Sequence, residues 1–402
     1  MRLRDCETLI VAPPAPGWGG RWWALVKLTA DDGTVGWGEC YAGSIGPLAL
    51  KAVIADVFAR HCAGADVWDT DLMFRRALSS GFSQRPDPTV IGAFSGIEIA
   101  CRDLQGKAAG LPVWKLLGGR VNPKVRLYTY LYPDDPADAA FYSDADRSAA
   151  AAARFADEGW TAVKFDPAGP YGIRGGRQPA VAEVDRSARF CAALREAVGA
   201  RADLLFGTHG QFTPAGAIRV GRSIEPWDPL WFEEPVPPGD PDAMAQVARA
   251  VRVPIAAGER LATRWEFLPL LRAGACAILQ PALGRAGGLG EGMRIAQMAE
   301  AFGAQVAPHL YAGPVEWAAN LHLCTTAPNA LVAETIDTPF HRALIGHALV
   351  PEGGWAAPGD APGLGIEVDE ALARAHAYEG DRLPLEMQEA PPDPLGAGHA
   401  EG

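Results

Sequence analysis

Residues 231–235 read Trp-Phe-Glu-Glu-Pro and residues 256–260 read Ala-Ala-Gly-Glu-Arg, and these two segments decide the fold of the chain. In each segment an apolar run typical of a buried strand stops at a carboxylate, first Glu233 and then Glu259. Carboxylates that close successive strands are typical of the mouth of a parallel β/α barrel, where the strand ends converge. Two such acids could bind a divalent cation through oxygen ligands. The alternative is a pair of surface glutamates that follow two strands.

The chain around these segments alternates short apolar stretches with helical ones from residue 121 onward. The pattern predicts strands near 125–130, 160–165, 203–207, 229–232, 254–257, 276–280, 304–307 and 330–333. Residues 183–198 give the clearest helical pattern between them. No Gly-x-Gly-x-x-Gly follows the first strand, so a dinucleotide-binding sheet lacks its phosphate turn. We therefore predict an α/β fold with a TIM-like (β/α)7–8 barrel.

The first part of the chain has a different pattern, which indicates an α+β region. Residues 21–28 and 33–40 are strand-like, and the Asp-Asp-Gly turn at 31–33 joins them. Helical periodicity dominates residues 48–78 and returns over residues 91–106. We expect these elements to form a cap in front of the barrel.

Composition changes along the chain mark the expected domain boundaries. Leu-Leu-Gly-Gly near residue 120 ends the capping domain, so we assign 1–120 to the cap and 121–350 to the barrel. Residues 355–385 are expected to complete the cap and to include a helix at 372–378. The proline-rich end, 386–402, is expected to be disordered.

A polar or charged side chain follows most of the predicted barrel strands. The group comprises Lys164, Asp166, His209, Glu233, Glu259, His309 and Glu334. One βα unit of this chain is about 25 residues long, and most of these side chains recur at intervals of one or two such units. One of them alone would be weak evidence, since a lone histidine after a strand is more often structural. Their common phase predicts that they meet at one site.

Composition narrows the classes of partner. The net charge of −12 argues against nucleic acid and disfavours an anionic membrane surface, but it allows a small anionic substrate. No apolar run approaches the ~20 residues of a membrane span, and the N-terminus lacks the apolar core of a signal peptide. The seven cysteines have no paired spacing for zinc or a redox motif. We expect a cytoplasmic protein with reduced cysteines.

Several motifs together resemble the enolase superfamily, in particular its mandelate racemase-type branch. In the cap these are Ser-Gly-Ile-Glu-Ile-Ala-Cys-Arg-Asp-Leu-Gln-Gly-Lys from Ser95 and Leu-Leu-Gly-Gly from Leu116. In the barrel they are Glu-Glu-Pro from Glu233, Gly-Glu-Arg from Gly258, Ile-Leu-Gln-Pro from Ile278 and Ala-Gly-Gly from Ala286. Ala-Pro-His at 307–309 is similar to the galactonate dehydratase-like enzymes. Lys-x-Asp at 164–166 and Thr-His-Gly-Gln at 208–211 are also similar to cycloisomerases that open anhydrogalactonate.

The resemblance implies abstraction of a proton α to a carboxylate, with Mg²⁺ or Mn²⁺ as the Lewis acid that stabilises the resulting charge. Glu233 and Glu259 match two metal ligands of the family. The implied catalytic groups are the possible bases Lys164 and His309, the general acid His209, and the substrate-facing Asp166 and Glu334.

Three positions depart from the family pattern. Gly207 stands where the family has an Asp metal ligand, so either His209 moves in as a ligand, or water does, or metal binding is weaker. Ala282 stands where the branch has an Asp that orients the seventh-strand histidine, so His309 becomes a weaker base or a donor. Asp166 replaces a lysine of the pattern and could keep Lys164 protonated or orient a substrate hydroxyl.

Substrate selection is expected in the cap, where Trp18, Arg21, Trp22 and Tyr41 lie on stretches that line the substrate in this superfamily. Trp18 and its proline-glycine loop could form a lid or pack on the hairpin. The Gly-rich loop at 169–177 could close on the substrate or contact a neighbouring subunit.

The predicted reaction is β-elimination from a sugar acid, as in an aldonate dehydratase, by a homo-oligomeric enzyme. Cycloisomerisation of an anhydro-sugar acid is the alternative, followed by racemisation or epimerisation. A degenerate sugar-acid binder is the hypothesis from a different class, motivated by Gly207 and Ala282.

Overall fold

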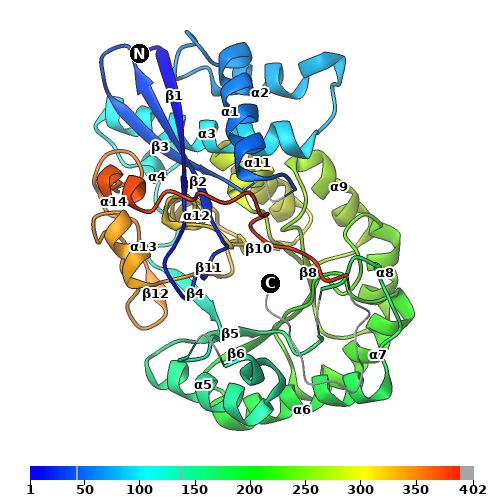
Figure 1. The fold of residues 1–402 in the computed structure, drawn as a ribbon. Coiled ribbons are helices and arrows are strands. Elements are labelled where there is room, and N and C mark those ends of the chain that lie inside the picture. Colours follow the sequence, from blue (N-terminus) through cyan, green and yellow to red (C-terminus); the bar gives the residue numbers. More distant parts are fainter. Residues whose placement is uncertain (42–43, 136–137, 170, 390–402) are drawn as a thin grey trace.

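The computed structural model describes residues 1–41, 44–135, 138–169 and 171–389. The first sheet along the chain belongs to the cap (Figure 1). Three antiparallel strands lie in the order β1-β2-β3: β1 (Leu3–Val11), β2 (Trp23–Ala30) and β3 (Val35–Cys40). The predicted hairpin is β2–β3. The sequence did not predict β1, because Arg4, Asp5 and Glu7 interrupt its apolar pattern and lie on an edge strand.

The helices of the cap cover one side of this sheet. They are α1 (Pro47–His61), α2 (Thr70–Leu78), the short 3₁₀ helix η1 (Ser80–Phe82), α3 (Pro88–Ala109) and α4 (Val113–Leu116). Asp87 caps the start of α3 through two backbone N–H groups, and Gly110 ends it in the left-handed conformation. Gly38 of β3 faces Gly96 of α3 so closely that a Cβ on Gly38 would lie 1.9 Å from the Gly96 carbonyl oxygen. The pair of glycines therefore allows the longest cap helix to lie directly on the sheet.

Eight parallel strands form the barrel, at the positions that the sequence predicts. They are β4 (Val125–Tyr130), β5 (Ala162–Phe165), β6 (Asp203–Phe206), β7 (Trp231–Glu233), β8 (Ile255–Ala257), β9 (Ile278–Leu279), β10 (Gln305–Val306) and β11 (Ala333–Thr335). From β4 to β10 each strand pairs with the next, and β11 pairs with β4. A parallel bridge between Val306 and Ala330 joins the regions of β10 and β11. The predicted (β/α)7–8 barrel with an α+β cap is confirmed.

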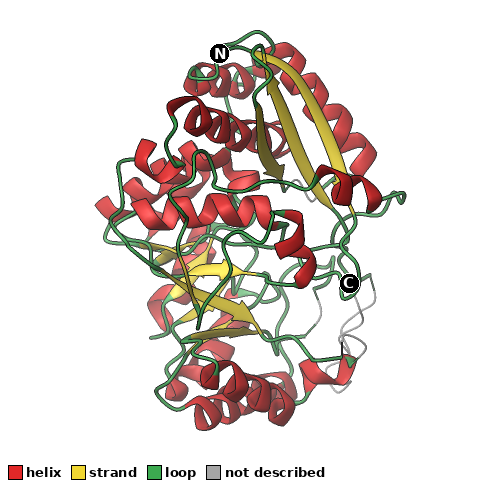
Figure 2. Ribbon diagram, turned by 90° about the vertical axis from the view of Figure 1, so that its left-hand side faces the viewer, coloured by secondary structure: helices red, strands yellow, loops and turns green. Residues whose placement is uncertain are grey.

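Helices surround the strands on the outside of the barrel (Figure 2). They are η2 (Ala139–Ser143), α5 (Ala145–Asp157), α6 (Val181–Val198), α7 (Pro214–Ile224), η3 (Glu225–Trp227), α8 (Pro241–Ala250), α9 (Thr263–Ala273), α10 (Leu283–Ala286), α11 (Gly288–Ala301), α12 (Pro314–Thr326) and α13 (Pro339–Leu344). The barrel interior is filled by side chains such as Tyr128, Leu205 and Trp231. None of the described helices is long and apolar enough to cross a membrane.

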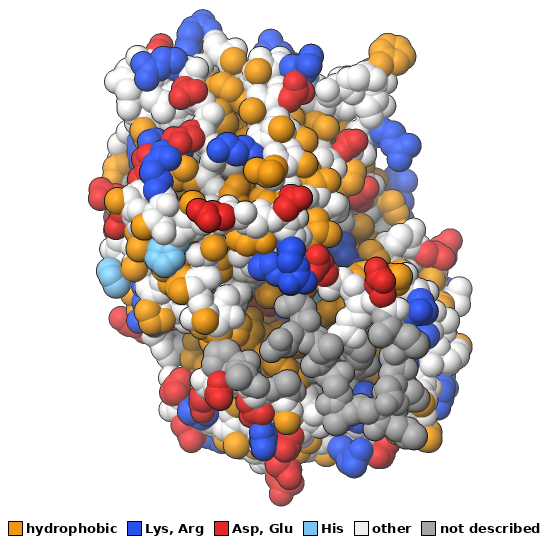
Figure 3. Space-filling view, viewed as in Figure 1, with side chains coloured by type: hydrophobic (Ala, Val, Ile, Leu, Met, Phe, Trp, Pro, Cys, Tyr) orange, Lys and Arg blue, Asp and Glu red, His pale blue; other side chains and the backbone are white. Residues whose placement is uncertain are grey.

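The C-terminal segment returns to the cap and then crosses to the barrel (Figure 1). Strand β12 (Trp355–Ala356) pairs with β4. Helix α14 (Glu370–Ala375) lies against β1 and overlaps in sequence with the helix predicted at 372–378. Gln388 and Glu389 contact the loop after β5, where Gln388 pairs with Gly172 and Arg174 donates to the carbonyl oxygen of Glu389. Residues 390–402, most of the tail expected to be disordered, lie outside the described residues. On the face in Figure 3, acidic and basic side chains are interspersed rather than segregated.

Candidate active site

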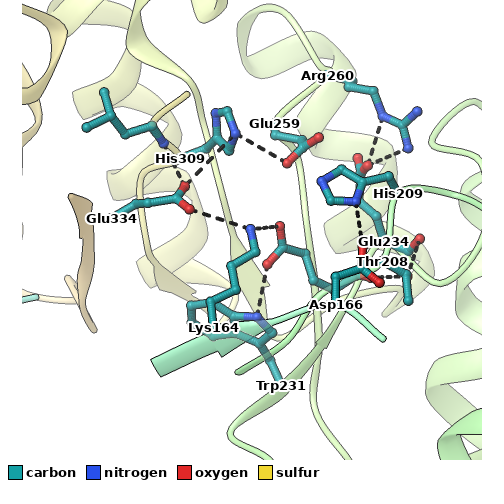
Figure 4. A network of polar contacts seen from close by, with 12 residues as sticks. Lys164, Asp166, Thr208, His209, Trp231, Glu234, Glu259, Arg260, His309 and Glu334 are labelled. Atoms are coloured by element: carbon teal, nitrogen blue, oxygen red, sulfur yellow. Dashed lines mark hydrogen bonds and ion pairs between the residues drawn. The ribbon is translucent and has the colours of Figure 1, made fainter. Parts of the chain in front are cut away.

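The polar residues predicted from their common phase converge at the C-terminal ends of the barrel strands (Figure 4). Lys164 lies on β5, Glu233 ends β7 and Glu334 lies on β11, while the other members lie within three residues of a strand end. Lys164, Glu233, Glu259, His309 and Glu334 are all buried. Charged groups rarely occupy such positions without partners, so their contacts reveal what each one does.

Lys164 is held as an ammonium by two carboxylates. Its Nζ atom lies 2.6 Å from Glu233 Oε1 and 3.6 Å from Glu334 Oε1. Burial alone would lower the pKa of Lys164, but these acids outweigh it and raise the pKa well above its usual range. The partner of Lys164 is therefore Glu233 and not the neighbouring Asp166.

Asp166 instead contacts His209. His209 Nδ1 lies 3.1 Å from Asp166 Oδ2, and the Tyr171 hydroxyl donates to the same oxygen at 3.0 Å. Burial lowers the pKa of His209, but the carboxylates of Glu259 and Asp166 raise it more, so the net shift is upward. The upward shift favours the protonated imidazole, which is the form that a general acid requires.

His309 has the opposite tendency. Burial lowers its pKa to about 4, although Glu259 opposes the shift. Its Nε2 atom faces Glu259 Oε2 at 3.5 Å and Glu334 Oε2 at 4.0 Å. Its Nδ1 atom is buried without a hydrogen-bond partner, and Ala282, the predicted departure, offers none. His309 is therefore a neutral imidazole whose ring is positioned by packing, including a stack with Tyr41 at 5.7 Å between centroids.

Glu334 completes the cluster on the side of β11. Burial raises the pKa of Glu334, while Lys164 and the backbone N–H of Leu310, which donates at 2.8 Å, oppose the shift. Glu334 thus lies between the Lys164 ammonium and the His309 ring.

Comparison with known proteins agrees with this architecture. The model of the mandelate racemase / muconate lactonizing enzyme N-terminal domain matches residues 20–118, and the enolase C-terminal domain-like model matches residues 147–372. The chain belongs to this family. The predicted resemblance to the mandelate racemase-type branch of the enolase superfamily is confirmed.

Relatives and solved structures of the family cover nearly the whole chain. D-galactonate dehydratase of Ralstonia nicotianae is 34% identical over 362 residues, 87% of this chain and 90% of that protein. D-xylonate dehydratase of Haloferax volcanii is 32% identical over 394 residues, 95% of this chain and 90% of that protein. The crystal structure of a mandelate racemase/muconate lactonizing enzyme-like protein from Roseovarius sp. TM1035 has a TM-score of 0.97 at 62% identity, covering 98% of this chain and 100% of that one.

Dehydratases of the enolase superfamily generally use a divalent metal ion, and the donors of this chain do not fit one. Glu233 has a partner at each oxygen, the Lys164 ammonium at Oε1 and the Trp231 indole N–H at Oε2, 3.0 Å away. Glu259 keeps one buried oxygen without a hydrogen-bond partner, and His209 contacts Asp166. Among the described residues, no group of three or more His, Cys, Asp or Glu side chains is arranged to hold a metal ion. Glu233, Glu259 and His209 are therefore not assembled as a metal centre here.

The four cap residues predicted to bind substrate lie in different environments. Tyr41 stacks on His309 and so reaches the site. Trp18 stacks on Tyr132 of the barrel, with ring centroids 4.1 Å apart, and thus bridges the two parts of the molecule. Arg21 and Trp22 contact the C-terminal segment: the Arg21 guanidinium donates to the carbonyl oxygen of residue 383, and the Trp22 indole to that of residue 382.

The loop after β5 is anchored within this chain wherever it is described. The Arg177 guanidinium pairs with Glu183 of α6 at 2.5 Å. Arg174 donates to the carbonyl oxygen of Glu389, and Tyr171 reaches Asp166. Arg174 and Arg177 therefore pair with groups away from the strand ends, while Tyr171 supports the Asp166–His209 contact.

The sequence interpretation missed two features of the site. Glu234 and Arg260, the neighbours of the two glutamates in the opening motifs, form an ion pair at 2.5 Å that joins the ends of β7 and β8. Arg285, at the start of the Arg-Ala-Gly-Gly segment, lies over the Tyr41 ring at 4.5 Å and forms no ion pair within the described part of the chain. Glu234 and Arg260 directly follow Glu233 and Glu259, and this position could have suggested that they also pair. No spacing in the sequence indicates where Arg285 lies.

Proposed function

We propose that the chain dehydrates a sugar acid, removing the proton α to the carboxylate and eliminating the β-hydroxyl group as water. Relatives named D-galactonate and D-xylonate dehydratase, aligned over nearly the whole chain, support this reaction. The structural observation that carries the proposal is the pair His309 and His209, whose pKa values are shifted in opposite directions at one barrel mouth. Environments that push two pKa values apart provide an acid and a base at the same pH.

His309 accepts the α-proton. With a pKa of about 4 it is neutral near pH 7, and its Nε2 atom faces the acids of the cluster. Loss of the α-proton adds a second negative charge to the substrate carboxylate, and that charge requires donors already in place. The Lys164 ammonium is such a donor, and Glu334 lies between it and His309.

His209 gives its proton to the leaving hydroxyl group. When the C–O bond breaks, the leaving oxygen keeps the electron pair, takes the proton from His209 and departs as water. The resulting enol tautomerises to a 2-keto acid. One proton moves to His309 and one leaves His209, so the enzyme regains its starting state by transferring one proton between them through solvent. Asp166 and Tyr171 position the imidazole for this donation.

The other reactions considered are not favoured, since the named relatives are dehydratases. A homo-oligomer remains our expectation, to be measured by light scattering on the purified chain. Because dehydratases of the family generally use a divalent ion and the carboxylates of Glu233 and Glu259 are oxygen donors, Mg²⁺ and Mn²⁺ are the two ions to supply in assays.

A panel of aldonic acids tests the proposal, with 2-keto acid formation and exchange of the α-hydrogen with deuterated solvent as readouts. Each acid is assayed with a chelator and, separately, with Mg²⁺ or Mn²⁺ supplied. We expect turnover of at least one acid, loss of exchange in His309→Asn, and unchanged activity in the exposed control His347→Asn. Absence of both product and exchange for every acid, under every condition, would refute the dehydratase.

A further inference from the structure

The end of β6 has no side chain at residue 207, and the stem of Lys164 occupies the adjoining space. A Cβ added to Gly207 would lie 3.2 Å from Lys164 Cε, 3.4 Å from the Phe165 carbonyl oxygen and 3.6 Å from Asp166 Cβ. The backbone of Gly207 is outside the left-handed region, so its conformation does not require glycine. The close approach of the lysine stem is the feature that distinguishes this position.

The ammonium at the end of that stem occupies the centre of the acid cluster (Figure 4). It lies 2.6 Å from Glu233 and 3.6 Å from Glu334, and Lys164 is only 2% exposed. An ammonium has three N–H donors. Glu233 accepts one of them in a hydrogen bond, and Glu334 lies beyond hydrogen-bond distance, so a donor is left to meet an oxygen of a bound substrate.

The net charge of the Lys164 cluster equals the charge that a metal-bound cluster would have. The Lys164 ammonium faces the carboxylates of Glu233 and Glu334, and the three groups together carry one negative charge. A divalent ion held by Glu233, Glu259 and a third carboxylate at residue 207 would also leave one negative charge. In both arrangements a cation lies among acids at the strand ends, where it can meet the carboxylate of an incoming substrate.

We propose that the Lys164 ammonium takes the place of a divalent metal ion at this site, binding the substrate carboxylate and stabilising the charge that develops on it, in the space that Gly207 leaves. The assignment rests on the proposed function for its chemistry, but its ion-binding consequence stands separately. Among the described residues the wild-type site has no complete ligand set for a divalent ion, and a carboxylate at residue 207 would supply the missing ligand.

Titration of the full chain with Mn²⁺, followed by the electron paramagnetic resonance of the free ion, tests this consequence without an activity assay. We expect no stoichiometric binding to wild type. Gly207→Asp should bind at least about ten-fold more tightly, because carboxylate charge sets the affinity of oxygen sites. Gly207→Asn is the matched control, with the same size and no charge, and should stay near wild type. Adding Lys164→Met to Gly207→Asp should tighten binding again.

Stoichiometric binding of one Mn²⁺ per wild-type chain would overturn the proposal. The wild-type titration decides the matter even if the Asp variant fails to fold. As a second measurement, turnover of any accepted sugar acid should change less than about two-fold on chelation, since the ammonium is part of the chain. Loss of turnover on chelation, with recovery in Mg²⁺ or Mn²⁺, would overturn the proposal while leaving the dehydratase intact. Conversely, if no acid is turned over, the dehydratase fails and the Mn²⁺ titration still decides the role of Gly207.

Discussion

Buried carboxylates occur in two regions of this molecule, and they are held in different ways. At the junction of cap and barrel, Glu39 of β3 faces the start of α12, whose backbone N–H groups donate to it at 2.5, 3.0 and 3.2 Å. Glu316 of α12 accepts in turn from the backbone N–H of Gly284 at 2.8 Å. At the barrel mouth, by contrast, the closest partner of Glu233 is the side-chain ammonium of Lys164.

The difference separates acids that hold the fold together from acids available for chemistry. Backbone donors at a helix start are fixed once the cap docks on the barrel, so Glu39 and Glu316 act as a structural joint. The Lys164 ammonium sits on a flexible stem and can share its donors with an incoming substrate. Changes at the joint should therefore alter stability with little effect on turnover, and changes at the mouth should do the reverse.

The largest effect is expected at the mouth, from His309→Asn. Removal of the base should lower kcat by about 10³-fold, in the range that general base catalysis contributes. The matched control is His322→Asn, at a buried histidine whose pKa is also lowered to about 4 but whose nitrogens contact backbone groups of Trp114 and Leu364. That variant should lower the free energy of unfolding and keep kcat within a few-fold. Steady-state kinetics measure kcat, and urea unfolding measures the free energy of unfolding. Equal losses of kcat in the two variants would contradict the separation of catalytic from structural residues.

The next effect concerns the joint and the pH dependence of stability. Burial raises the pKa of Glu39 from its ordinary 4.5 to about 7, although the backbone N–H groups of α12 oppose the shift. Because the folded state holds this proton more tightly than the unfolded state, its stabilising contribution is complete below pH 4.5 and is lost as the pH rises toward 7. The loss amounts to about 3 kcal/mol over that window. Glu316, with a pKa raised by burial to about 8, acts in the same direction.

Glu39→Gln isolates that contribution. The variant cannot titrate at this position, so its free energy of unfolding should fall less steeply than that of wild type between pH 4.5 and 7. Its kcat should stay within about three-fold of wild type, since the residue does not contact the mouth. Urea unfolding at several pH values gives the comparison. If the free energy of unfolding changes with pH equally in the two proteins, Glu39 does not cause the pH dependence.

A smaller effect is expected from Asp166→Asn at the mouth. The carboxylate of Asp166 is one of the groups that raise the pKa of His209, so its removal should lower that pKa. The alkaline limb of the kcat/KM profile should then move to lower pH, with a loss of about ten-fold at pH 8 and a smaller loss at pH 6. Arg177→Gln, in the same loop but paired with Glu183, is the control and should leave the limb in place. A uniform loss at every pH would point to a structural role for Asp166.

The sequence predicted where the functional groups lie better than it predicted which groups contact each other. The strand ends were found because burial makes the barrel strands apolar, and the phase of Lys164, Glu233 and Glu334 follows from strand spacing alone. Contacts depend on side-chain direction and reach, which spacing does not encode. Asp166 was therefore considered as the partner of Lys164, whereas the structure pairs that lysine with Glu233. Strand β1 was missed for a related reason, since an edge strand tolerates charges that break the apolar pattern.

The smallest effect should come from Tyr171→Phe, which removes one hydroxyl group from the mouth. The Tyr171 hydroxyl donates to Asp166 Oδ2 at 3.0 Å, and its ring lies 4.1 Å from the His209 ring between centroids. Phenylalanine keeps the ring and loses the hydrogen bond, so the Asp166 side chain is less firmly oriented toward His209. We expect kcat to fall by about two- to five-fold, the range of one hydrogen bond of about 0.5–1 kcal/mol. Tyr378→Phe, at a tyrosine packed on Trp22 in the cap, should change nothing. A loss as large as that of Asp166→Asn would mean that Tyr171 contacts the substrate directly.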